Sequence, residues 1–556
     1  MKTPPAFDPD PSPRATDLSR RDFLDRVGWL AGGSVAGAAF LPGLTARPSG
    51  LLVPSGMRQE AVVETTHGRI LGGTEEGVHV FKGIPYGANT TGPNRWMPPR
   101  DPEPWTDVRD AREYGPTAAQ GSGTGSEDCL VMNVFTPALA DGGARPVMLW
   151  LHGGGFRSLS GSSAMYDGVN LCNRGDVVVC SLNHRLNVFG YLHLGDVAGD
   201  RYRDSGNVGM LDIVHALHWI QDNIERFGGD PRNVTIFGES GGGRKVSTLL
   251  AMPAARGLFQ RAIIQSGPGI KLQPRDRSTE MALALLGEVG LSGSQVARLH
   301  ELPMETLLAA YDTVEGALDG DARDKGVFEQ HGFVPTVGVP SLPGYAFDPV
   351  ATEVSAEVPI LIGSNQHELA YQSRSDPAFM ERTLTEEGLR ERLRLIAGEE
   401  TDRVLETYRR VYGADVHPAV IDVLVRSDRT YRFDSIQLAQ RKAAQGRAPV
   451  WMYLFAWETP VNGGRTLAHH ALEITFAFDN VVKVPAMSGG GPEAAALADK
   501  MSEAWIAFAR SGNPNTAKLP RWDAYAPPER ATMVFDDASG VVEDPHREVR
   551  ELWARM

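Results

Sequence analysis

The chain has 556 residues, several times the length of one small domain, and its 42% hydrophobic and 22% charged residues are ordinary for a globular protein. This composition excludes global disorder and a collagen-like repeat. The 55 basic and 69 acidic residues give a formal net charge of −14, which would repel a phosphate backbone, so nucleic-acid binding is not expected.

The N-terminal segment has the order of features found in a twin-arginine export signal. Arg20 and Arg21 are followed by Phe-Leu and then by a weakly apolar Gly/Ala stretch at 27–41, which is shorter than the roughly 20 residues that span a bilayer. The pattern predicts that residues 1–46 address the protein to the twin-arginine export machinery. The alternative is a disordered tail with a chance arginine pair, which Asp25 and the lack of an A-x-A cleavage site favour.

Export would place the mature protein in the periplasm or the medium, and the cleavage point stays open. Residues 47–60 are interpreted as a linker, and residues 61–556 as a single domain. The rest of the sequence also holds no apolar stretch long enough to span a membrane, so stable membrane insertion is not expected.

From residue 61 onward, strand-like and helix-like segments alternate. Short apolar runs such as 147–151 and 177–180 predict buried strands, and the segments 209–227 and 493–510 predict helices. Alternation of this kind is typical of a mainly parallel sheet with helices on both faces. The charged region at 383–412 is interpreted as an exposed helical insertion. The predicted fold class is therefore α/β.

A glycine loop follows the first of these apolar runs. The segment Leu151-His152-Gly153-Gly154-Gly155-Phe156 could direct backbone N–H groups toward a developing oxyanion. A glycine loop after a strand is also common without any catalytic role.

A second glycine motif places Ser240 between Gly238 and Gly242, after a strand-like run and before a helix predicted at 244–252. This context suits a nucleophile elbow, where only small residues fit two positions on either side of the serine. The motif by itself arises by chance, and a flexible glycine turn is the alternative.

A nucleophilic serine needs a base and an orienting acid, and fourteen histidines leave the base open from composition alone. His470 stands in a cluster near the C-terminus, and Glu368 follows an apolar strand-like run at 358–362. His470 and Glu473 could instead share a helix face as metal ligands. Because no further group shows recognisable ligand spacing, neither a metal nor a cofactor is expected.

Together these segments resemble the type-B carboxylesterase/lipase family of α/β hydrolases, and the resemblance covers residues 61–550. The serine signature matches at 227–242 and a second family signature at 127–134. Further matches lie at 81–86, 265–267, 505–509 and 512–514.

The resemblance implies the α/β-hydrolase fold and hydrolysis of a carboxylic ester of small-molecule size. It also implies a role for each matching position: nucleophile Ser240, acid Glu368, base His470, oxyanion-hole amides of Gly154, Gly155 and Gly241, and a hydroxyl near the acid from Ser266. A catalytically inactive binding or adhesion protein on the same fold is an alternative, which the intact triad positions disfavour. A lipase or acyltransferase variant is another alternative that no motif separates from a soluble esterase.

The sequence departs from the family in its cysteines. In disulfide-bearing relatives the position of Cys129 pairs with an upstream cysteine, where this chain has Ala118, so that bridge is not expected. Cys172 and Cys180 are interpreted as free thiols, with a pair as the alternative. The loop before Cys129 carries no Trp, so choline esters are not expected to be preferred substrates. The natural ester and the oligomeric state are not predicted.

Overall fold

The computed structural model describes residues 60–121, 123–323 and 332–556. The predicted export signal at 1–46 and all but the last residue of the predicted linker at 47–60 lie outside these ranges, so they stay predictions. Among the residues that the structure describes, no helix combines the length and the apolar character needed to cross a bilayer.

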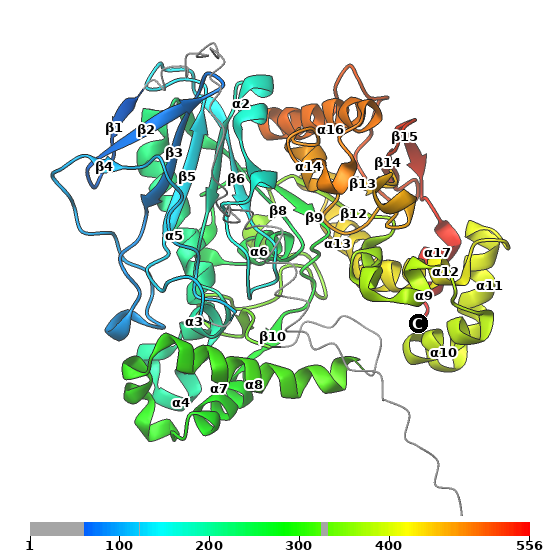
Figure 1. Cartoon of the computed structure of the whole chain (residues 1–556), viewed down its shortest axis with the longest axis horizontal. Helices are drawn as coiled ribbons and strands as arrows, with labels where there is room; N and C mark the ends of the chain where they lie inside the picture. The colour runs from blue at the N-terminus through cyan, green and yellow to red at the C-terminus, as the bar shows by residue number, and fades with distance from the viewer. Residues whose placement is uncertain (1–59, 122, 324–331) are drawn as a thin grey trace, which may run out of the picture. The chain divides into compact units, whose positions relative to one another are not determined.

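A thirteen-stranded sheet organises the described residues (Figure 1). Its strands are β1 (Ala61–Glu64), β2 (Arg69–Glu75), β3 (Val78–Pro85), β4 (Arg109–Asp110), β5 (Val131–Thr136), β6 (Arg145–Leu151), β7 (Val178–Leu182), β8 (Gly229–Glu239), β9 (Arg261–Gln265), β12 (Ile360–Asn365), β13 (Val450–Phe455), β14 (Ala531–Phe535) and β15 (Gly540–Glu543). The order is β1-β2-β3-β5-β7-β6-β8-β9-β12-β13-β14-β15, with β4 beside β2. A separate parallel pair joins β10 (Gln273–Pro274) to β11 (Thr336–Val337).

Every pairing between β7 and β14 is parallel, and the other pairings along the strand order are antiparallel. The short strand β4 pairs with β2 in parallel. The central strands read as continuous apolar runs because they are buried on both faces, as β6 is along its whole length. The predicted α/β-hydrolase architecture with a large, mainly parallel sheet is confirmed.

The helices lie between the strands in the chain. They are α2 (Val169–Gly175), α3 (Asn187–Tyr191), α4 (Gly195–Ala198), α5 (Val208–Asn223), α6 (Gly241–Leu249), α7 (Arg275–Glu288), α8 (Met304–Arg323), α9 (Pro377–Met380), α10 (Glu386–Ala397), α11 (Thr401–Tyr412), α12 (Pro418–Ser427), α13 (Phe433–Ala444), α14 (Ile474–Ala477), α15 (Pro485–Ser488), α16 (Pro492–Ser511) and α17 (Arg547–Trp553). The helix predicted at 209–227 is α5 followed by a 3-10 turn, and the one predicted at 493–510 is α16. The predicted insertion at 383–412 contains α10 and α11.

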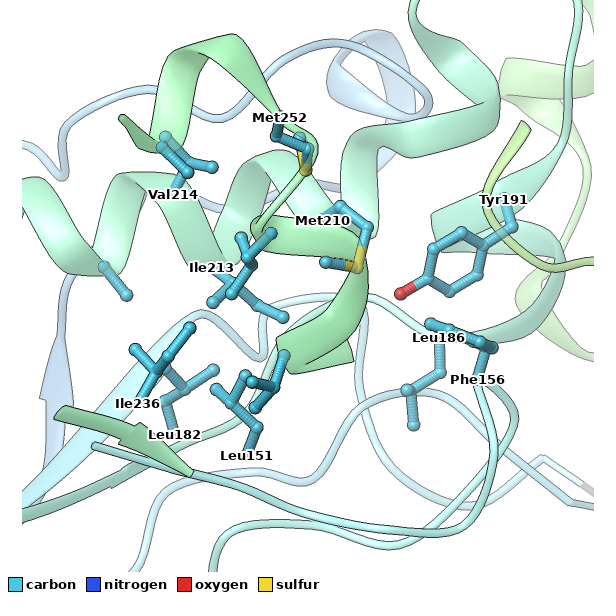
Figure 2. Packing of buried hydrophobic residues seen from close by; sticks show 14 of the residues in the cluster. Leu151, Phe156, Leu182, Leu186, Tyr191, Met210, Ile213, Val214, Ile236 and Met252 are labelled. Atoms are coloured by element: carbon cyan, nitrogen blue, oxygen red, sulfur yellow. The ribbon is translucent and has the colours of Figure 1, made fainter. Parts of the chain in front are cut away.

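A hydrophobic core fixes the carboxyl ends of the central strands. Leu151 of β6, Leu182 of β7 and Ile236 of β8 pack in one cluster with Met210 and Ile213 of α5 (Figure 2). All five side chains are fully buried, and each burial of this kind contributes about 1.5–3 kcal/mol. The residues that follow these strands therefore start from a rigid platform.

The carboxyl ends of parallel strands meet at one edge of a sheet, where ligands bind in open α/β folds. The glycine loop follows β6, Ser240 follows β8, and Glu368 lies three residues beyond β12. His470 lies on the connection after β13. Because β6, β8, β9, β12 and β13 are consecutive neighbours, the topology brings these segments to one edge.

Candidate active site

Ser240 occupies a sharp turn between β8 and α6. Its backbone has φ 56° and ψ −119°, and its N–H donates to the Gln265 carbonyl at 2.9 Å. A Cβ on Gly238 would lie 2.5 Å from the Leu151 carbonyl oxygen, and one on Gly242 would collide with the same atom. The turn therefore has the geometry of a nucleophile elbow, in which glycines allow the close approach of the backbones around the serine. Ser240 keeps partial solvent exposure.

The glycine loop packs directly against the start of α6. Gly154 and Gly155 have φ of 80° and 65°, a conformation that glycine adopts without steric cost. A Cβ on Gly241 would collide with the backbone of Gly155, whereas one on Gly155 would meet open space. Within the described residues the N–H groups of Gly154 and Gly155 donate to no carbonyl. These amides and that of Gly241, the first residue of α6, are available to a ligand anion.

A buried lysine that the sequence analysis did not single out supports this loop. The Lys245 ammonium is fully buried and donates to the His152 carbonyl at 2.8 Å. Burial lowers the pKa of Lys245 well below its ordinary value. The side chain ties the second turn of α6 to the residue before the three glycines. In the sequence, the only signal for this supporting role of Lys245 is its position five residues after Ser240.

His470 and Glu368 are in direct contact. The Nδ1 atom of His470 lies 2.5 Å from Oε2 of Glu368, and the His470 N–H donates to the Glu368 carbonyl at 3.1 Å. The second carboxylate oxygen accepts the N–H of Asn365 at 2.7 Å. Both side chains are buried, so a carboxylate held at two points fixes the ring and keeps the proton on Nδ1.

Two further glutamates adjoin this pair. Oε1 of Glu239, the residue before the serine, lies 3.1 Å from Nε2 of His470. Glu473 accepts amide hydrogens from Asn365 at 2.6 Å and Gln265 at 3.3 Å. Burial and Glu368 raise the pKa of Glu473 to about 7. Glu473, considered as a metal ligand from its spacing, here belongs to a hydrogen-bonded carboxyl cluster.

The Glu239–His470 pair holds a proton strongly. Burial lowers the pKa of His470, but Glu239, Tyr431 and Glu368 outweigh burial and raise it well above the ordinary value. Burial, with Glu473 and Glu368 nearby, also raises the pKa of Glu239, although His470 opposes this. One proton is therefore shared by the two groups to a higher pH than either would keep it alone.

Glu239→Gln is expected to move the acid limb of the kcat/KM profile to lower pH. Removing the negative charge beside Nε2 lowers the pKa of His470, so the free base is present at lower pH; an opposite charge at this distance is worth about 1–3 pH units. Ester hydrolysis measured from pH 5 to 10 tests this. Glu239→Asp, which keeps the charge, should leave the limb close to its wild-type position. An unmoved limb in Glu239→Gln would mean that Glu239 is neutral throughout.

The predicted residues are thus placed as follows. His470 and Glu368 are in contact. Ser240 directly follows Glu239, whose carboxylate lies beside Nε2 of His470. No hydrogen bond links Ser240 to His470 among the described residues. The Ser266 N–H donates to the Gly363 carbonyl at 2.9 Å beside the end of β12, while its buried hydroxyl finds no partner among the described residues.

The cysteines are all buried and free. Cys172 and Cys180 therefore form no disulfide, in agreement with the interpretation as thiols. Burial raises the pKa of both thiols, which leaves them protonated and unreactive at neutral pH.

Comparison with known protein families matches residues 59–553 to the carboxylesterase family. The chain belongs to this family. It is 36% identical over 505 residues to a para-nitrobenzyl esterase of Bacillus subtilis, a match covering 88% of this chain and 98% of the relative. It is 32% identical over 510 residues to a phenmedipham hydrolase of Pseudarthrobacter oxydans, covering 86% and 96% of the two chains.

Solved structures agree with this assignment. The carboxylesterase EST55 of Geobacillus stearothermophilus at pH 6.2 superposes with a TM-score of 0.77 at 39% identity, covering 88% of this chain and 99% of that one. This carboxylesterase is accordingly a carboxylic-ester hydrolase that acts on a small-molecule ester, and the predicted reaction class is confirmed.

Proposed function

We propose that this carboxylesterase hydrolyses its substrate through an acyl-enzyme on Ser240, with His470 as base and Glu368 as the residue that orients it. The contact of 2.5 Å between Nδ1 of His470 and Oε2 of Glu368, beside the serine at the end of β8, carries the proposal. It leaves Nε2 as the basic nitrogen, which lies beside Glu239, the residue before Ser240.

In the first half-reaction, Oγ of Ser240 attacks the ester carbonyl carbon while Nε2 of His470 takes its proton. The N–H groups of Gly154, Gly155 and Gly241 hold the oxyanion of the tetrahedral intermediate, and the N-terminus of α6 adds a favourable potential. Glu368 stabilises the imidazolium that forms. The intermediate then expels the alcohol, whose oxygen receives the proton from Nε2.

In the second half-reaction, Nε2 removes a proton from water as the water oxygen attacks the acyl-enzyme carbonyl. The same amides hold the second oxyanion. Collapse of this intermediate releases the carboxylic acid, and Oγ recovers its proton from His470. No step requires a metal or a cofactor, so EDTA is expected to leave turnover unchanged.

A fluorophosphonate probe tests the assignment of the nucleophile. We expect the probe to inactivate hydrolysis of p-nitrophenyl butyrate and to form one adduct, located by peptide mass spectrometry at Ser240. Prior addition of ester should slow the labelling. Full turnover after quantitative labelling of Ser240, or an adduct at another serine such as Ser266, would contradict the proposal.

We further propose that a twin-arginine signal within residues 1–46 exports the enzyme, which the order of the arginine pair and the apolar stretch supports. Active enzyme, shortened at its N-terminus, is expected outside the cytoplasm. Replacing Arg20 and Arg21 with lysine should hold it inside, whereas Arg14→Lys should not. A full-length cytoplasmic product from the unchanged gene would overturn this proposal.

A further inference from the structure

The glycine loop after β6 is anchored in the core at both of its ends. Leu151 before the loop and Phe156 after it are buried in the hydrophobic cluster (Figure 2). The three glycines between them lack a Cβ, and glycine changes its backbone conformation at little steric cost. The directions of the peptide groups within the loop therefore depend on the hydrogen bonds that their carbonyl oxygens accept.

Two buried side chains hold two consecutive carbonyl groups of this loop. The Lys245 ammonium donates to the His152 carbonyl at 2.8 Å, and Nδ1 of His152 donates to the Gly153 carbonyl at 2.9 Å. Lys245 is fully buried and His152 is 1% exposed, so water does not compete for either bond. The next carbonyl, that of Gly154, accepts two backbone N–H groups from the turn at 157–158, each at 3.2 Å.

The bond to the Gly153 carbonyl also sets the direction of the Gly154 amide. The two belong to one trans peptide group, in which the carbonyl and the N–H point in opposite directions. With the carbonyl turned toward the His152 ring, the Gly154 N–H is directed away from that ring. Gly153 itself lies beside the nucleophile, because a Cβ built on it would be 3.6 Å from Cβ of Ser240. His152 thus orients an amide next to the reacting serine.

The His152 ring is held in one tautomer. Because a carbonyl oxygen can only accept, the proton is on Nδ1, and Nε2 has no hydrogen-bond partner among the described residues. Burial, with Lys245 nearby, lowers the pKa of His152 well below its ordinary value, so the ring stays neutral. The His184 ring stacks on it, with the two centroids 5.2 Å apart. The ring therefore offers a single donor in a fixed direction.

We propose that His152 and Lys245 are positioning residues for the oxyanion hole: His152 directs the Gly154 N–H toward the oxyanion, and Lys245 holds the preceding peptide group. The inference rests on the proposed role of Ser240 as nucleophile, and neither side chain touches the substrate. Without these bonds the peptide group at 153–154 would be free to rotate between two glycines. A carbonyl oxygen turned toward the oxyanion would repel it instead of stabilising it.

His152→Leu and His152→Asn form a matched pair that tests this role. Both remove the ring and have similar volumes, but only the asparagine NH2 can replace Nδ1–H as the donor to the Gly153 carbonyl. We expect His152→Leu to lower kcat for p-nitrophenyl butyrate by about 10- to 100-fold, less than the complete loss of an oxyanion donor, and to leave KM within about threefold. His152→Asn should keep kcat within about threefold of wild type.

His184→Leu is the control for the loss of a buried histidine. His184 is fully buried, stacks on His152, and donates from Nδ1 to the carbonyl of the next residue, Arg185, at 2.9 Å. Because that carbonyl lies outside the glycine loop, His184→Leu should lower the melting temperature but leave kcat within about threefold of wild type.

Lys245→Met tests the second positioning residue. It keeps an apolar stem but removes the donor to the His152 carbonyl, so kcat is expected to fall about tenfold with KM nearly unchanged. Thermal unfolding of the variant verifies that it folds. An unchanged kcat in folded Lys245→Met would overturn the role assigned to Lys245.

A transition-state analogue separates oxyanion binding from general damage to the site. Oγ of Ser240 adds to the carbonyl carbon of 1,1,1-trifluoroheptan-2-one while His470 takes its proton, which leaves an oxyanion in the hole. Heptan-2-one is far less electrophilic and measures binding of the chain alone. In His152→Leu the Ki of the trifluoroketone should rise by the factor by which kcat/KM falls, while the Ki of heptan-2-one stays unchanged.

Equal losses of kcat in His152→Leu and His152→Asn would overturn the proposal. So would equal increases of Ki for both ketones, because that result indicates a structural role. If His152→Leu does not fold, His152→Asn decides alone: a kcat inside its expected limit upholds the proposal, and a larger loss overturns it. In each of these cases the fluorophosphonate probe would still label Ser240 of the wild-type enzyme, so the proposed catalytic function would stand.

Discussion

Ser240→Ala is expected to lower kcat for p-nitrophenyl butyrate by about 10⁴–10⁶-fold, and His470→Ala by a similar factor. The double variant should lose little more than either single one, because Oγ and Nε2 act in the same proton transfer. Turnover of the purified variants, with thermal unfolding to verify folding, measures this. The remaining activity should come from the oxyanion-hole amides and substrate binding.

Ser364→Ala provides a matched control for the serine. Ser364 is a buried serine in β12 whose hydroxyl has no hydrogen-bond partner among the described residues. Its loss should cost little activity. Losses from Ser240→Ala and His470→Ala that multiply in the double variant would contradict a shared step and require a different base.

The parts of the site that are local in sequence could be predicted from it. The glycines around Ser240 and in the loop after β6 are needed because backbones approach closely there, and that need is visible as a motif. Glu368 and His470 are 102 residues apart and meet because β12 and β13 pair in parallel from Ile360 and Val450. No local pattern encodes that pairing, so their assignment depended on resemblance to a family.

The electrostatic environment of the site could not be predicted from sequence. The raised pKa values of Glu239 and Glu473 follow from burial, which only the fold creates. Tyr431 reaches the His470 ring from a π-helical turn, Asp428–Arg432, that joins α12 to α13. Such turns are rare and often functional, and nothing in the helical pattern at 418–444 predicts one.

Glu368→Gln is expected to lower kcat by about 10³–10⁴-fold while the fold is kept. The glutamine carbonyl can still accept the Asn365 N–H, but its amide group would then face Nδ1 of His470 as a donor. Nδ1 would have to accept, which moves the ring proton to Nε2 and removes the base. Hydrolysis of p-nitrophenyl butyrate from pH 6 to 10 measures the loss.

Glu473→Gln tests whether the loss of kcat in Glu368→Gln comes from losing the group that orients the base or from losing a carboxyl group anywhere in the cluster. Glu473 has a pKa of about 7, contacts Asn365 and Gln265, and makes no hydrogen bond to His470 among the described residues. An amide there resembles the protonated acid, so kcat should fall less than about 10-fold, mostly through the weakened bond to Asn365 or Gln265. If Glu473→Gln lost as much as Glu368→Gln, the whole carboxyl cluster, and not the tautomer set by Glu368, would control the reaction.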